Sequence, residues 1–164
     1  MRSSLSITLL SLLLLILSAC SDNEEKPKYT VGVSLCGTTD AWRQALLTDI
    51  NVEAANYPDI GIQILDADQS SKTQIKQIKQ LARQKVDLIV ISSKDEDSIS
   101  TIASEIYRSG IPTIILERKL NTEDYSAFIG ADNYEIGRAV GNYIASSLKG
   151  KGNVVELTGL GGST

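Results

Sequence analysis

The sequence of 164 residues predicts an α/β protein built on a doubly wound parallel sheet. Short apolar runs of strand length alternate with longer segments whose apolar residues recur at helical spacing, and polar loops separate them. Two of the runs, 87–91 and 112–116, are almost uniformly apolar, which is typical of parallel strands that helices cover on both faces. Right-handed crossovers are expected to join consecutive strands.

The first half of the chain supplies two strands and two helices. A strand is expected at Tyr29 to Leu35, and a helix at Asp40 to Asn56, with Asp40 as its N-cap. The apolar stripe of this helix consists of Ala41, Ala45, Ile50 and Ala54. A second strand at 60–65 precedes a helix at 70–84, in which isoleucine and leucine recur at helical spacing.

The second half repeats this alternation and then stops after a strand. The expected strands are 87–91, 111–116, 127–130 and Asn153 to Leu157, and the expected helices are 97–109, ended by Gly110, and Tyr134 to Leu148. A glycine-rich segment, 159–164, follows the last strand, and no helix follows it. We therefore expect a fragment of a longer α/β protein. The alternative is a small natural domain with a frayed tail.

The N-terminus has the pattern of an export signal. Met1 and Arg2 lead into an apolar run, Leu9 to Leu17, that is shorter than the roughly 20 residues of a membrane-spanning helix. Leu17 to Cys20 resembles the lipobox of bacterial lipoproteins. The resemblance implies that residues 1–20 form a signal peptide, cleaved before a lipidated Cys20. The alternative is an uncleaved signal anchor. Residues 21–28 read as a polar tether.

Composition excludes several classes of function. The net charge of −4 and the lack of a Lys/Arg cluster argue against nucleic acid as a partner. The chain contains no histidine, which removes the usual hydrolase triads and most zinc sites. Cys36 is left unpaired once Cys20 is assigned to lipid, so it reads as a small buried residue at a strand end. We expect no enzyme activity, no metal and no cofactor.

Three weaker motifs have simpler structural explanations. The segment 159–164 follows a strand as a phosphate loop would, but it lacks the required lysine and reads as a turn. Asp66 and Asp68 could suggest a metal pair, yet such residues at a strand end are more often loop and cap residues. A receiver domain needs an acidic residue after its third strand, where this chain has Ser92 and Ser93.

Polar residues after three of the strands form the candidate site. They are Thr38 to Arg43, Ser92 with Ser93, and Glu117 with Arg118. The carboxyl ends of parallel strands share one edge, where open α/β sheets bind ligands. Arg118 can donate to vicinal hydroxyls, Glu117 can accept from them, and Trp42 can stack on a sugar. The alternative is that Trp42 belongs to the core and that Glu117 and Arg118 form a surface pair.

These residues also carry a family resemblance. Glu117-Arg118, followed by Ala127 to Asn133 (AFIGADN), resembles the type I periplasmic binding proteins of the ribose- and galactose-binding kind, and the likeness covers 29–164. Further motifs resemble the sensor region of hybrid two-component regulators from polysaccharide-degrading gut bacteria. These motifs are 31–34 (VGVS), 40–44 (DAWRQ), 117–119 (ERK), 125–138 and 150–159.

The resemblance implies two lobes joined by a hinge, which close over a mono- or oligosaccharide. Lobe one corresponds to 29–130, and 131–164 begins an incomplete lobe two. The sugar-contacting positions fall on Asp40, Trp42, Arg43, Ser92, Glu117 and Arg118. This chain departs from the family by having Glu117 where aspartate is common, and Ser93-Lys94 where a Pro-Asn-like turn is common. Asp132 and Asn133 are expected to be hinge and cap residues.

Two non-catalytic functions follow from the resemblance. The first is a periplasmic, membrane-anchored sugar sensor for a histidine kinase that would lie beyond residue 164, with a homodimer of the full-length sensor left open. The second is a solute-binding lipoprotein of a sugar transporter. We expect weak or absent sugar binding by these 164 residues alone. A glycosidase using Glu117 and Asp132 is a distant third, because nothing places the two carboxylates across one bond.

Overall fold

The computed structural model describes residues 26–157, which form an α/β fold with a five-stranded sheet and four helices in that range. The expected leader with its lipobox and Cys20, most of the tether and the glycine-rich segment 159–164 lie outside the described residues. No helix in the described part of the chain has the length and apolar character needed to cross a membrane.

The sheet is entirely parallel and follows the order β2-β1-β3-β4-β5. Its strands are β1 (Tyr29–Leu35), β2 (Ile60–Asp66), β3 (Leu88–Ser92), β4 (Thr113–Glu117) and β5 (Ala127–Gly130). Leu35 is in register with both Asp66 and Ser92, and Glu117 is in register with Gly130. The carboxyl ends of all five strands therefore meet at one edge, as the sequence predicted.

The helices begin at side chains that cap their first turn. They are α2 (Ala41–Ala54), α3 (Ser71–Arg83), α4 (Glu96–Arg108) and α5 (Asn133–Ser147). Asp40, Ser70, Asp95 and Asp132 each accept a hydrogen bond from the backbone N–H three residues later. The predicted caps Asp40 and Asp132 are thus confirmed. Gly110 has a φ of +96° after α4, as expected of a glycine that ends a helix.

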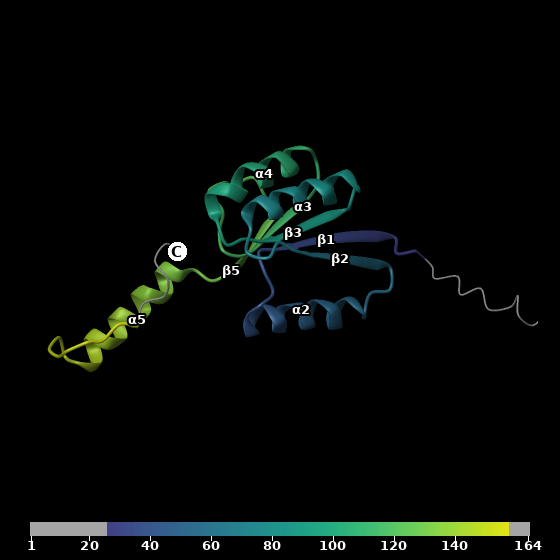
Figure 1. Ribbon diagram of the computed structural model, residues 1–164. Helices are drawn as coiled ribbons and strands as arrows, with labels where there is room; N and C mark the ends of the chain where they lie inside the picture. Colours follow the sequence, from purple (N-terminus) through teal and green to yellow (C-terminus); the bar gives the residue numbers. More distant parts are fainter. Residues whose placement is uncertain (1–25, 158–164) are drawn as a thin grey trace, which may run out of the picture.

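The core lies between the sheet and the two helices α3 and α4, which cover the same face (Figure 1). Ile78, Leu81, Ile89, Ile91 and Ile115 are among its fully buried side chains. A Cβ on Gly32 would come within 2.8 Å of a Leu81 methyl, so the glycine allows α3 to approach β1. From α3, the buried Gln74 donates to the carbonyls of Ser34 (3.3 Å) and Ser92 (2.9 Å), which ties the ends of β1 and β3 together.

Among the described residues, α2 is the one helix on the opposite face, and it lies near β2 at the sheet edge (Figure 1). None of the α2 residues, all of which the structure describes, is buried. Ile50 and Ala54 line a cavity of about 410 Å³ with Val31, Ile60 and Ile62.

This arrangement limits the burial of the two most apolar strands. Val90 and Ile114, which alternate with core residues on β3 and β4, are only half-buried. The expectation that helices cover both faces of these strands therefore holds fully only on the α3 and α4 side. The difference arises because α2 sits beside the other edge of the sheet.

The chain leaves the sheet after β5, and α5 projects away from it (Figure 1). None of the α5 residues, which are all described, is buried. The predicted strand at Asn153 to Leu157 is wrong, because these residues have no regular structure and Leu157 is 95% exposed. A strand requires a hydrogen-bonded neighbour, and the described residues place none beside this segment. The predicted lobe boundary near residue 130 stays a prediction.

Candidate functional site

Glu117 lies at the edge of the sheet where the carboxyl ends of the strands meet, and it contacts several of the predicted site residues. It is the last residue of β4 and has a φ of +74°, which is a rare backbone conformation for a residue other than glycine. Such conformations cluster at functional sites, where surrounding contacts hold them in place. Asp68, Gln69, Lys85 and Lys149 also have a positive φ, so the backbone of Glu117 is consistent with a site at this edge and does not identify one by itself.

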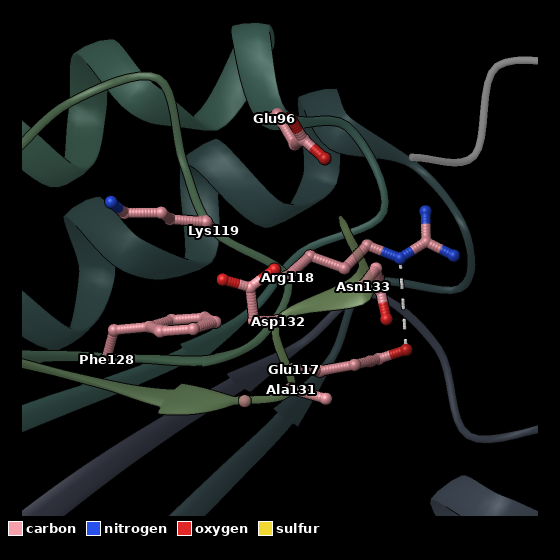
Figure 2. Close-up of a pocket in the computed structure, with 9 residues that line it drawn as sticks. Glu96, Glu117, Arg118, Lys119, Phe128, Ala131, Asp132 and Asn133 are labelled. Carbon is pink, nitrogen blue, oxygen red and sulfur yellow. Dashed lines mark ion pairs between the residues drawn. The ribbon is translucent and has the colours of Figure 1, made fainter. Parts of the chain in front are cut away.

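The two carboxylate oxygens of Glu117 have different surroundings. Oε2 accepts hydrogen bonds from Ser92 Oγ (3.1 Å) and Arg43 Nη2 (3.3 Å). Oε1 lies 3.9 Å from Arg118 Nε, which is an ion pair but too long for a hydrogen bond (Figure 2). The protein thus holds one oxygen firmly and leaves the other in a looser pairing with Arg118.

Arg43 lies in the first turn of α2, and its side chain is only 14% exposed. Its Nη1 donates to Asp40 Oδ2 (2.5 Å), while its backbone N–H donates to Asp40 Oδ1 (2.9 Å). The backbone hydrogen bond first and the guanidinium second hold the pKa of Asp40 below its usual value. Asp40, Arg43 and Glu117 therefore form a continuous chain of charge-assisted contacts between α2 and β4.

Arg118 and Trp42 supply the other two predicted contacts. Arg118 reaches the loop after β3, where its Nη1 donates to the Lys94 carbonyl at 3.4 Å. Trp42 is 53% exposed, so the part of the alternative that places it in the core is wrong. The other part expected Glu117 and Arg118 to pair, and they do so at 3.9 Å. The guanidinium carbon of Arg43 lies 5.9 Å from the centre of the Trp42 ring. The indole therefore remains available beside the charged groups.

Two adjoining cavities open at this edge. The larger one, about 580 Å³, has an apolar wall and a charged end, and its lining includes Trp42, Leu46, Leu116, Ile129, Glu117 and Arg118. The other, about 520 Å³, is lined mainly by polar residues that include Lys119 and Asp132, with Phe128 beside them (Figure 2). Glu117 and Arg118 border both. Apolar walls with a few convergent polar groups are typical of small-molecule sites and suit the two sides of a sugar.

The six predicted site residues separate into two sets. Trp42, Glu117 and Arg118 line the larger cavity. Asp40, Arg43 and Ser92 are not among its lining residues. Ser92 is fully buried and its hydroxyl donates to Glu117, whereas the Asp40 side chain is 44% exposed. Direct contact of all six with a ligand stays a prediction, and the structure gives the second set a supporting position.

Some lining residues were missed by the sequence reasoning. Leu46, Leu116 and Ile129 supply the apolar wall, and Asn133, expected to be only a hinge or cap residue, borders both cavities. The signal for Ile129 and Asn133 was present, since both fall within the motif at 127–133. Leu46 carried no signal, because its role depends on where the first turns of α2 lie relative to β4.

Cys36 is buried, and Asp66 at the end of β2 and Asp68 after it make local hydrogen bonds. Cys36 is 2% exposed directly after β1, and burial raises the pKa of its thiol. Asp66 accepts hydrogen bonds from the Thr38 hydroxyl and the Asp68 backbone N–H, so it organises the adjoining loops. Within residues 26–157, no group of three or more potential ligands could hold a metal ion.

The sequence matches the family described as periplasmic binding protein domain over residues 31–164. It is 26% identical to the ribose import binding protein of Bacillus subtilis, covering 100% of this chain and 56% of that protein. It is 31% identical to the galactofuranose-binding protein of Escherichia coli, covering 82% of this chain and 43% of that protein. The chain thus spans about half the length of the curated relatives it matches.

The chain is also similar to solved structures of periplasmic sugar-binding proteins. The fructose-binding periplasmic domain of a hybrid two-component system is 45% identical, with a TM-score of 0.73 over 82% of this chain and 44% of that chain. The arabinose transporter binding protein from Shewanella sp. ANA-3, bound to arabinofuranose, is 29% identical, with a TM-score of 0.71 over 82% of this chain and 45% of that chain. With its parallel sheet and the family match, the chain has the type I periplasmic binding protein fold and belongs to the periplasmic binding protein family.

Proposed function

We propose that this chain is part of the sugar-binding sensor domain of a hybrid two-component histidine kinase. The observation that carries the proposal is the 45% identity to a fructose-binding domain of such a system. The proteins named for ribose and galactofuranose binding are 26% and 31% identical. The role proposed is binding, and any kinase activity would belong to residues beyond 164.

The site geometry supports a sugar as the ligand. Glu117 and Arg118 both line the larger cavity, and in the proposed mode Glu117 Oε1 accepts from one hydroxyl while the Arg118 guanidinium donates to an adjacent one. Trp42, Leu116 and Ile129 give the ligand an apolar wall, which suits the C–H face of a sugar ring. These groups are complementary to a neutral polyhydroxylated ring, and none of them needs to react with it.

The proposed ligand class is a sugar in its five-membered furanose form. Two of the similar proteins are named for galactofuranose or described with bound arabinofuranose. A third is named for fructose, a ketose that populates furanose forms in water. A furanose ring is flatter and smaller than a pyranose ring, so selection between the two forms would depend on the shape of the cavity that Trp42, Leu116 and Ile129 line.

Calorimetry on the full-length protein tests the ligand class. We expect fructose or an aldose that populates the furanose form to bind with a Kd of about 10 μM or tighter. Glucose, which is almost entirely pyranose, serves as the control and is expected not to bind. The ring form of the bound ligand is read from the carbon-13 shift of a labelled anomeric carbon. Tight binding of a pyranose, or of none of these sugars, would contradict the proposal.

The alternative function is a solute-binding lipoprotein of a sugar transporter. The lipobox-like segment Leu17 to Cys20 and the similarity to transporter binding proteins favour it. The coding sequence after Thr164 discriminates between the two functions. A second lobe followed by a membrane span and a kinase supports the sensor, whereas a stop codon after the second lobe supports the transporter component.

Membership of the periplasmic binding protein family implies a periplasmic location. We propose that the chain is held at the membrane, either by lipid on Cys20 or by an uncleaved signal anchor. Metabolic labelling with a fatty acid separates the two forms of attachment. Label lost on Cys20→Ser indicates a lipid anchor, whereas a protein that is never labelled and keeps its leader indicates a signal anchor.

A further inference from the structure

Asp40 differs from the other aspartate caps because its second carboxylate oxygen contacts an arginine side chain. Asp95 and Asp132 cap α4 and α5 by accepting from Ser98 N–H (3.1 Å) and Glu135 N–H (3.0 Å). Asp40 makes the same kind of bond to Arg43 N–H at 2.9 Å, but its second oxygen also holds the Arg43 guanidinium at 2.5 Å. Through Nη2, that guanidinium reaches Glu117, which is 74 residues away in sequence.

Glu117 needs such a contact because a competing partner lies next to it. Arg118 Nε is 3.9 Å from Oε1, and a small rotation of the Glu117 side chain would close this gap into a direct hydrogen-bonded pair. That pair would use both groups proposed to bind the sugar. Arg43 and Ser92 prevent the rotation by holding Oε2 at 3.3 and 3.1 Å.

The contact through Arg43 depends in turn on Asp40. An arginine side chain has several rotatable bonds, and holding it in one conformation costs entropy unless a strong contact fixes it. Asp40 provides that contact to Nη1, and it does so from a backbone position fixed by its own capping bond. Asp40 itself lies outside the lining of both cavities at this edge.

We propose that Asp40 is a positioning residue of the sugar site, which acts through Arg43 to keep Glu117 Oε1 turned toward the ligand and apart from Arg118. The inference rests on the proposed function. It changes the role expected for Asp40 from ligand contact to orientation of a contact that another residue makes. The two oxygens of Asp40 then have different roles. Oδ1 caps α2, and Oδ2 holds the Arg43 guanidinium that contacts Glu117.

The test uses a substitution that keeps the helix cap and removes only the link to the site. Serine is as good an N-cap as aspartate, but its side chain is too short to bridge to the guanidinium as well. In Asp40→Ser we therefore expect the thermal midpoint to change little and the sugar Kd to rise about tenfold. The control is Asp95→Ser, which keeps the cap of α4 and removes the contacts of Asp95 Oδ2 with the hydroxyls of Ser98 and Ser71. It is expected to leave the Kd within about twofold, because Asp95 lines neither cavity.

A double-mutant cycle with Glu117→Gln distinguishes positioning from a purely structural role. If Asp40 acts through Glu117, Asp40→Ser should weaken binding by less than about twofold once Glu117→Gln is present. The full-length protein and calorimetry with the best-binding sugar of the panel are used throughout.

Equal losses in the two backgrounds, or no loss in either, would overturn the positioning role while leaving the proposed function standing. An unaltered protein that binds none of the sugars would overturn the proposed function and this inference with it. Should Asp40→Ser lower the thermal midpoint markedly, Asp40→Asn, which also keeps a capping oxygen, takes its place in the same cycle.

Discussion

Replacement of Arg43 by alanine is expected to weaken sugar binding by about a hundredfold, because a Glu117 side chain that pairs with Arg118 no longer offers its hydrogen bond to the sugar, and a hydrogen bond to a charged group contributes about 1.5–3 kcal/mol. The Arg43 side chain is 14% exposed and contacts the carboxylates of both Asp40 and Glu117. Its removal leaves Glu117 without its charged anchor and allows the pair with Arg118 to close. Calorimetry on the full-length protein measures the change in Kd.

The matched control removes another arginine that forms an ion pair. Arg108 lies 2.6 Å from Asp124, but its side chain is 73% exposed and distant in the fold from β4's carboxyl end. Arg108→Ala is expected to change the Kd by less than about twofold, since exposed ion pairs contribute little. A similar loss in both variants, or full affinity in Arg43→Ala, would show that the contact with Glu117 has no role in binding.

Replacement of Ile91 by alanine is expected to lower the free energy of unfolding by about 3 kcal/mol, as for other large-to-small changes in packed cores. Ile91 is fully buried on β3 and packs in the cluster formed with α3 and α4. The cost includes both the lost burial of the side chain and the cavity that remains. Urea unfolding followed by circular dichroism measures it.

Val90 provides the control on the same strand. It faces the side of the sheet on which α2 is the only described helix, and it is only half-buried. Val90→Ala is therefore expected to cost less than about half as much as Ile91→Ala. Equal costs would mean that the α2 face is as tightly packed as the α3 and α4 face, contrary to the arrangement described above.

The parallel sheet could be predicted because its signals are local. Strands such as β3 and β4 are short apolar runs, and Asp40, Asp132 and Gly110 each mark a helix end within a few residues. The error at 153–157 has a physical reason. An apolar run has the composition of a strand, but it forms one only where a neighbouring strand supplies hydrogen bonds, and sequence alone does not show that neighbour.

The sequence predicted which strand ends carry the site residues, but it did not predict the contacts between their side chains. That Glu117, Arg118 and Trp42 meet follows from the rule that parallel strands share a carboxyl edge. The contact between Arg43 and Glu117 could not be predicted, because it depends on the position of α2 across 74 residues of sequence. The burial of Ser92 and the hydrogen bond from its hydroxyl to Glu117 likewise could not be predicted, because both depend on how β3 and β4 pack side by side.

A crystal structure of the full-length protein with its sugar bound tests the central claim most directly. The account predicts a sugar hydroxyl within hydrogen-bonding distance of Glu117 Oε1 and another at the Arg118 guanidinium, with Trp42 against the ring. It also predicts that Ser92 and Arg43 still hold Oε2, as they do here at 3.1 and 3.3 Å. A sugar bound elsewhere, or one that displaces Ser92 and Arg43 from Oε2, would contradict the account.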